Sequence, residues 1–262
     1  MTEPESTNHR RHDAPGALRS QATLEIQTRQ AQRLVYGRRA EGGVQGIVGL
    51  LRFAALLRVI WSGSVNDDPY ADWWLVQIEQ ELLAARETVA ALRGEVDARL
   101  ESAPAVNITL AQSLEPARVD LNFSNPYAFM AAYLLADFDA LVRAVLTARH
   151  VGLLDRAGAE RLLQEGGRSV RRAYNTAHGY RYLALTRDDV RQGTSKAIRA
   201  RELLGDLPRA VLEGELRADH APELRRREPE GSDAVSGPSG DEADPTDPGG
   251  ASSAMAAAGR HV

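Results

Sequence analysis

Residues 68–101 decide the fold class of this chain, and their sequence is DPYADWWLVQIEQELLAARETVAALRGEVDARLE. Asp68 and Pro69 form a favourable helix start, because Asp accepts hydrogen bonds from free N–H groups and Pro suits the first helical position. Apolar residues then recur every three or four positions and form one stripe on a helix. The stripe comprises Ile78, Leu82, Ala85, Val89, Leu92, Val96 and Leu100. We therefore predict a long helix whose stripe is a packing seam within the chain, with a coiled-coil dimer as the alternative.

Other segments with helical character lie on both sides of this helix. Asn125-Pro126 repeats the Asp-Pro start, and residues follow it at helical spacing as far as Arg149. Thr186 and Asp189 have the spacing of a capping box, and Gly205 is a suitable end for the helix that they begin. Further helices are expected over residues 47–61, from Asp155 to about Tyr174, and after Pro208.

Three short runs alternate apolar and polar residues, which is typical of strands with one buried face. They are residues 22–28, 106–111 and 118–123. A short connection that contains Pro116 separates the second run from the third, so we predict that these two runs pair as a hairpin. The fold class is therefore α+β and mainly α, with several helices around a small antiparallel sheet.

The composition divides the chain into three parts. Residues 1–20 are polar and lack an apolar period, and residues 226–262 are acidic and rich in Pro, Gly, Ser and Ala. Such segments do not bury enough apolar surface to offset the entropy of ordering, so we predict that both are disordered. Residues 21–225 are predicted to form a single globular helical domain with a small sheet.

The residues that enzymes and metal sites need are missing or wrongly spaced. The chain has no cysteine, and its six histidines lack the spacing of a metal-binding helix. Gly43, Gly46 and Gly49 precede a helix, but no Lys-Ser or Lys-Thr pair follows them as it would in a phosphate loop. The His-x-x-Arg pattern that begins at His178 lacks the downstream tyrosine of a recombinase. We predict that the protein is not an enzyme and that it has no metal, no cofactor and no small-molecule substrate.

The sequence gives no sign of membrane insertion or export. The N-terminus has no signal-peptide pattern, and the most apolar stretch, residues 44–61, contains Arg52 and Arg58. A stretch of this length with two charges falls short of a membrane span. We therefore expect a cytoplasmic protein with no membrane partner.

Charge is unevenly distributed along the chain. Residues 140–201 carry thirteen basic residues, among them Arg168, Arg171 and Arg172, against five acidic residues, which is a net charge of +8. A basic region with tyrosines among its residues is typical of a nucleic-acid interface. The alternative is a solvated face whose charge is neutralised within the chain by the acidic helix of residues 70–101. Composition alone does not separate these two interpretations.

A set of longer motifs resembles proteins encoded on bacterial integrating conjugative elements. The motifs are TRQAQR at residues 28–33, NDDPYADWW at 66–74, SLEPARVDLNFSNPY at 113–127, LLADFD at 134–139, TARH at 147–150 and TRDDVRQG at 186–193. Together they are similar to the AcaB-like transcriptional regulators of mobile elements. The resemblance covers about residues 20–225 and is specific for membership, but much less specific for mechanism.

The resemblance implies a dimeric regulator that binds double-stranded DNA through a ribbon-helix-helix core. In such a core, a strand from each subunit pairs into a ribbon that lies in the major groove. Residues 118–123 are the place for it, and Arg118, Asp120 and Asn122 would face base edges while the residues between them face the helices. Arg168, Arg171 and Arg172 would contact phosphate. The alternative is a plain hairpin within one chain, with residues 106–111 at the ribbon's edge.

Two other function classes were compared with the regulator. The first is a protein-interaction component of conjugative transfer or element maintenance that never contacts DNA and uses the Trp73-Trp74 region with the acidic helix. The second is a nuclease or recombinase accessory, which the missing metal ligands and tyrosine disfavour. The regulator remains our prediction.

Overall fold

A computed structural model describes residues 22–103 and 106–225, and over these residues the protein is mainly helical with little sheet. The head and tail that we predicted to be disordered lie outside the described residues. The elements follow one another as β1 (Thr23–Ile26), α1 (Arg29–Tyr36), β2 (Gly37–Arg38), β3 (Ile47–Val48), α2 (Leu50–Val65), α3 (Pro69–Glu101), β4 (Ala117–Asp120), α4 (Pro126–His150), α5 (Arg156–Asn175), the 3-10 helix η1 (Thr176–Gly179), α6 (Arg187–Gln192), α7 (Ser195–Leu204) and α8 (Arg209–Leu212).

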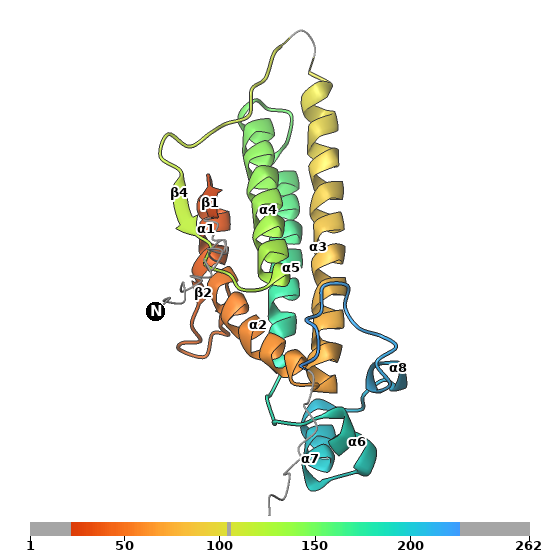
Figure 1. Ribbon diagram of the computed structural model, residues 1–262. Helices are drawn as coiled ribbons and strands as arrows, with labels where there is room; N and C mark the ends of the chain where they lie inside the picture. The colour runs from red at the N-terminus through yellow and green to blue at the C-terminus, as the bar shows by residue number, and fades with distance from the viewer. Residues whose placement is uncertain (1–21, 104–105, 226–262) are drawn as a thin grey trace, which may run out of the picture. The chain divides into compact units, whose positions relative to one another are not determined.

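Helices α3, α4 and α5 pack side by side and form the main body of the fold (Figure 1). α3 has 33 residues, which corresponds to a length of about 50 Å. The apolar stripe from Ile78 to Val96 is buried, and α4 and α5 cover it. The stripe is therefore a packing seam within the chain, as predicted.

The predicted helix starts have the expected capping contacts. An Asp68 carboxylate oxygen accepts hydrogen bonds from the backbone N–H groups of Tyr70 at 2.9 Å and Ala71 at 3.3 Å. The Asn125 side chain accepts from the N–H of Ala128 at 3.0 Å. Both contacts satisfy N–H groups that have no partner inside the helix. Local sequence alone thus determines where α3 and α4 begin.

The sheet differs from the predicted hairpin. β4 pairs antiparallel with β1, with Leu24 opposite Val119, and residues 106–111 form no strand. The hairpin prediction was therefore wrong. α4 holds the segment before β4 instead, because the Thr147 hydroxyl accepts from the Ala111 N–H at 3.0 Å and Arg143 donates to the Ala111 carbonyl at 2.8 Å. These two contacts use the backbone groups that a hairpin would have needed.

A second small sheet closes the loop after α1. β2 and β3 pair antiparallel, with Gly37 opposite Val48. A Cβ atom on Gly37 would lie 2.2 Å from the Ile47 carbonyl oxygen, and the φ angle of Gly37 is +70°. Only glycine fits this position without strain. The segment between α1 and α2 is thus a hairpin.

A buried ionic cluster connects the C-terminal segment, residues 187–217, to the helical bundle. Asp72 of α3 is fully buried, and both of its oxygens are engaged by arginines from the segment after α5. Arg187 also forms an ion pair with Asp67, and Arg217 donates to Asp72 at 3.0 Å. Ser64 of α2 donates to the same carboxylate. These charged contacts join α2, α3 and residues 187–217 in one buried network.

In the part of the chain that the structure describes, none of the helices is long and apolar enough to cross a membrane.

Candidate nucleic-acid interface

The β1–β4 ribbon has one apolar face and one polar face. Val119 and Leu121 are buried against the helices, whereas Arg118, Asp120 and Asn122 are exposed. The outward and inward positions are thus the predicted ones. The strand itself ends at Asp120, so Asn122 lies just beyond it. Phe123 is partly buried, and its ring packs edge-on against Phe129, with 5.5 Å between ring centroids.

The polar face includes residues of β1 that the sequence analysis did not assign to the site. Arg118 has 75% of its side chain exposed and lies 3.8 Å from a Glu25 carboxylate oxygen. The Thr23 hydroxyl donates to Asp120 at 3.2 Å. An exposed ion pair at this distance is weak, so the Arg118 guanidinium is free to exchange Glu25 for another acceptor. β1 was predicted as a strand, but its pairing with β4 could not be read from the alternation.

One edge of β4 has backbone groups that point away from β1. The Leu121 N–H donates to the Ala22 carbonyl at 2.8 Å. In an antiparallel pair the direction of these groups alternates along the strand. The N–H and C=O groups of Arg118 and Asp120 therefore point away from β1, to an edge that no strand of the described residues covers.

A buried carboxylate on α4 positions the ribbon. Asp139 accepts hydrogen bonds from the backbone N–H groups of Gln27 and Thr28, both at 2.9 Å, and from the Thr28 hydroxyl at 2.6 Å. Thr28 in turn caps α1 by accepting from the Ala31 N–H. Asp139 thus fixes the junction of β1 and α1 to the middle of α4. The sequence signal was an acid, Asp139, directly after Phe138 in the apolar stripe of α4.

The three predicted phosphate-contacting arginines lie on α5 in three different environments. Arg172 is paired with Glu81 of α3 at 2.9 Å. Arg168 is exposed, and no carboxylate of the described residues lies within ion-pair distance of it. Arg171 is partly buried, and first its burial and then the charge of Arg168 lower its pKa. The acidic helix thus neutralises part of the basic region, as the alternative interpretation expected, but not all of it.

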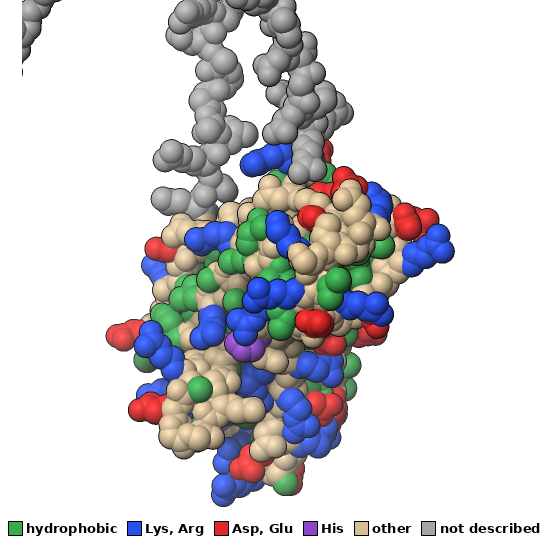
Figure 2. Space-filling model, turned by 90° about the horizontal axis from the view of Figure 1, so that it is seen from below, with side chains coloured by type: hydrophobic (Ala, Val, Ile, Leu, Met, Phe, Trp, Pro, Cys, Tyr) green, Lys and Arg blue, Asp and Glu red, His purple; other side chains and the backbone are tan. Residues whose placement is uncertain are grey.

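Basic side chains also cover other parts of the surface. Figure 2 shows the end of the molecule at which Figure 1 places α6 and α7, and Lys and Arg side chains are scattered there among hydrophobic and acidic ones. Lys196, Arg199 and Arg201 are exposed residues of α7. The positive charge is therefore spread over more than one face.

The Trp73-Trp74 region is occupied by contacts within the chain. Trp74 donates from its indole N–H to the Thr176 carbonyl at 3.1 Å and packs against the ring of Tyr180. Both tryptophans are partly buried against the core. This pair of residues therefore serves the packing of η1 on α3.

No set of three or more His, Asp or Glu side chains in the described part of the chain is placed to hold a metal ion.

Comparison with solved structures first gives the class of fold. The crystal structure of selenomethionine-containing AcaB from uropathogenic E. coli matches with a TM-score of 0.53 and 14% sequence identity, over 78% of this chain and 98% of that chain. At this identity the match shows a shared fold. No curated protein matches the chain.

Comparison with protein families then gives the family. The model of the family "Transcriptional regulator AcaB" matches residues 14–225, which is most of the chain. The protein belongs to this family of transcriptional regulators, as the motifs predicted.

Proposed function

We propose that the protein is a dimeric DNA-binding transcriptional regulator of an integrative conjugative element, and that its β1–β4 ribbon reads DNA. The observation that carries the proposal is the outward row of Arg118, Asp120 and Asn122 above an apolar underside. Guanine pairs with arginine, adenine with asparagine, and the cytosine amine with aspartate in the major groove. These are the residue types that a base-reading ribbon needs.

The dimer would form at the free edge of β4. Pairing with β4 of a second copy would use the outward backbone groups of Arg118 and Asp120 and give a four-stranded sheet in the order β1–β4–β4–β1. Four strands span about 14 Å between the outermost backbones, and the major groove is about 12 Å wide. The two central β4 strands would therefore enter the groove, while each β1 strand would lie against the DNA backbone.

This arrangement differs from a plain ribbon-helix-helix core in two respects. Each ribbon strand has an extra strand beside it, and α4 has 25 residues, about 37 Å. The ribbon meets α4 at Asp139, and α5 begins only after α4 has continued for eleven more residues to His150. The start of α5 is thus about 16 Å further along the axis. We therefore assign the phosphate contacts to arginines further along α5 and not to the start of this helix.

The proposed phosphate contacts are Arg168, Arg171 and Arg172, and they should differ in strength. Arg168 and Arg171 have no carboxylate partner among the described residues, whereas Arg172 must exchange Glu81 for phosphate. Each phosphate contact makes log K fall with log salt by about 0.9. Arg168→Ala and Arg171→Ala should therefore lower the salt slope more than Arg172→Ala does.

The test is binding of the full chain to promoter DNA of its own element, measured by fluorescence anisotropy from about 50 to 200 mM salt. Arg118→Ala and Asn122→Ala should each weaken specific binding by ~1–3 kcal/mol and leave non-specific binding unchanged. Arg199→Ala on α7 is the matched control, because it removes an exposed arginine away from the ribbon. Absence of salt-dependent binding would reject the proposal.

Dimerisation through β4 has its own test. Asp120→Pro removes an outward N–H and spares the groups that pair with β1, whereas Asp120→Ala keeps the N–H. Sedimentation should show that only the proline variant dissociates into monomers. Leu121→Glu is a poorer test, because Leu121 is buried within one chain. A wild-type monomer at micromolar concentration would exclude the shared ribbon.

A further inference from the structure

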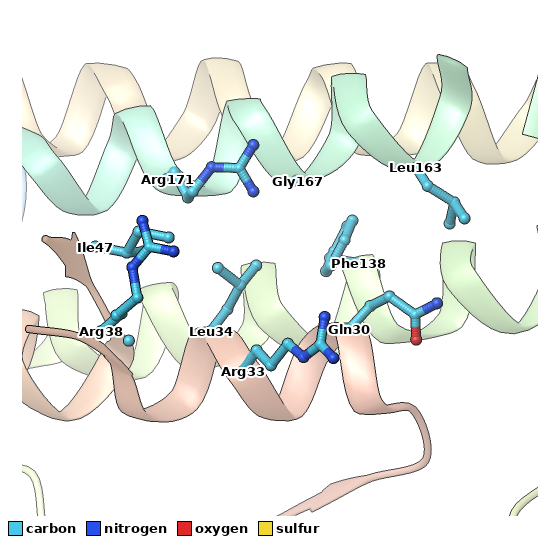
Figure 3. Close-up of a pocket in the computed structure, with 10 residues that line it drawn as sticks. Gln30, Arg33, Leu34, Arg38, Ile47, Phe138, Leu163, Gly167 and Arg171 are labelled. Atoms are coloured by element: carbon cyan, nitrogen blue, oxygen red, sulfur yellow. The ribbon is translucent and has the colours of Figure 1, made fainter. Parts of the chain in front are cut away.

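A cavity opens between α1 and α5. Its volume is about 530 Å³, which lies within the usual range of small-molecule sites. Figure 3 shows α1 on one side, α5 on the other and Phe138 of α4 between them. The lining residues group as an apolar floor and a polar rim.

The rim of the cavity is strongly basic. Arg33 of α1, Arg38 of β2 and Arg171 of α5 line it together with Gln30, and none of its lining residues is acidic. Among the residues that the structure describes, no carboxylate lies within ion-pair distance of these three arginines. Arg38 donates to the Gln45 carbonyl at 3.0 Å, which leaves most of its N–H groups unused. A rim that has three arginines and no acidic partner for them favours the binding of an anion.

The floor of the cavity is apolar. Leu34, Ile47, Phe138 and Leu163 form it. Gly167 lines it as well, and a Cβ atom there would lie 3.1 Å from an Arg171 guanidinium nitrogen and 3.5 Å from the Phe138 ring. A glycine within a helix costs ~1 kcal/mol relative to alanine. Because Gly167 has no Cβ atom, space stays open beside Arg171 despite this cost in helix stability.

Positive charge continues past the rim into a neighbouring cavity. This second cavity has a volume of about 400 Å³, shares Arg38 and Ile47 with the first, and adds Arg52 and His178 to its lining. Its lining residues also include no acid. A dianionic group placed near Arg38 would therefore meet basic side chains from both cavities.

We propose that the cavity between α1 and α5 binds a small phosphorylated molecule with a planar or apolar body, of the mononucleotide class. The guanidinium groups of Arg33, Arg38 and Arg171 bind the phosphate, because the planar fork of arginine matches phosphate oxygens. The body of the ligand lies on Leu34, Phe138 and Leu163, and the Gln30 amide can donate to it and accept from it. Three separate segments supply the arginines, which is why the sequence predicted no small-molecule ligand.

The test is isothermal titration calorimetry of the full chain, without DNA, using GMP, AMP, inorganic phosphate and octanoate. Wild-type protein should bind a mononucleotide more tightly than phosphate, and octanoate least. Arg33→Gln, Arg38→Gln and Arg171→Gln should each weaken nucleotide binding about ten-fold or more, the loss of one charged hydrogen bond. The matched control Arg199→Gln should leave binding unchanged.

A floor variant tests whether the ligand lies inside the cavity. Leu163→Phe fills part of the floor without changing charge, so it should weaken nucleotide binding and spare inorganic phosphate. Thermal unfolding of each variant checks that the fold is intact. Three results would each overturn the proposal. They are an equal loss of nucleotide affinity in Arg199→Gln and the rim variants, tighter binding of octanoate than of nucleotide, and no nucleotide binding at millimolar concentration.

The two proposals share Arg171, but nucleotide binding is measured without DNA, so they fail separately. A protein that binds promoter DNA but no nucleotide refutes the ligand site and leaves the regulator proposal intact, whereas the reverse result refutes only the regulator. Promoter duplex is also added as a competitor of bound nucleotide. Because Arg171 is assigned to both the rim and the DNA backbone site, competition is expected of the wild type; nucleotide binding by Arg33→Gln and Arg38→Gln that stays at wild-type strength would overturn the small-ligand proposal.

Discussion

Replacement of Asp72 by alanine should strongly destabilise the fold, because it removes the carboxylate that holds Arg187 and Arg217 of the C-terminal segment. Asp72 is fully buried and faces two arginines, of which Arg187 has only 6% of its side chain exposed. Removing one partner of a buried pair leaves an uncompensated charge and costs ~3–5 kcal/mol. Most domains have only about 5–15 kcal/mol in total. The variant should therefore lose a large share of its stability.

The assay is urea unfolding followed by circular dichroism, with Glu160→Ala as the matched control. Glu160 pairs with Arg156 at 2.8 Å on the exposed surface of α5, so its loss should leave the free energy of unfolding almost unchanged. Arg187→Met should cost less than Asp72→Ala, because Arg217 still neutralises the buried Asp72. A loss below about 1 kcal/mol for Asp72→Ala would refute the reasoning that Asp72 is the buried partner of both arginines.

Four further predictions test other parts of the molecule. Glu25→Gln should tighten promoter binding in anisotropy titrations, because it removes a negative charge from the strand that would face the DNA backbone; unchanged or weaker binding contradicts this. Gly166→Ala should lower the unfolding midpoint although alanine favours helices, because its Cβ would lie 2.9 Å from Leu141. Asp68→Asn should be nearly neutral at acid pH, where both side chains are uncharged, and should gain on the wild type as the pH rises, because burial raises the pKa of the Asp68 carboxyl. Because the folded-state pKa is raised, Asp68 favours folding most below its unfolded pKa, and this contribution is lost as the pH rises through the folded-state pKa. The difference in unfolding free energy between wild type and variant should therefore change in favour of asparagine from acid to neutral pH. Urea melts measure this difference. Limited proteolysis should trim the chain to about residues 20–225 without loss of helicity, and protection of the tail would contradict the proposed boundaries.

The sequence predicted the elements whose cause is local. Asp68 and Asn125 cap the helices that they were expected to begin, and the stripe of α3 is buried as its period indicated. These features depend on neighbouring residues, so periodicity and capping chemistry are enough to find them. The mainly helical fold class followed from them.

The pairing of strands and the gathering of arginines were not predictable in the same way. The alternation in residues 106–111 indicated a strand, but Arg143 and Thr147 of α4 bind the backbone at its end instead. Tertiary contacts decide such cases, and alternation carries no information about the partner. Likewise, residues 140–201 were seen to be basic, but only the fold brings Arg171 of this region and Arg33 of α1 to one cavity.

The antiparallel pairing of β1 with β4 has a consequence for synthesis of the chain on the ribosome. Ile26 lies opposite Ala117 and Thr23 opposite Asp120, so the partner of the first strand is made more than ninety residues later. At about 5–20 residues per second, the first strand waits on the order of 5–20 s with both edges unpaired. Asp139, which holds the junction of β1 and α1, emerges later still. The ribbon is therefore completed only after α3 has been made, and the nascent chain carries an exposed strand until α4 has left the exit tunnel.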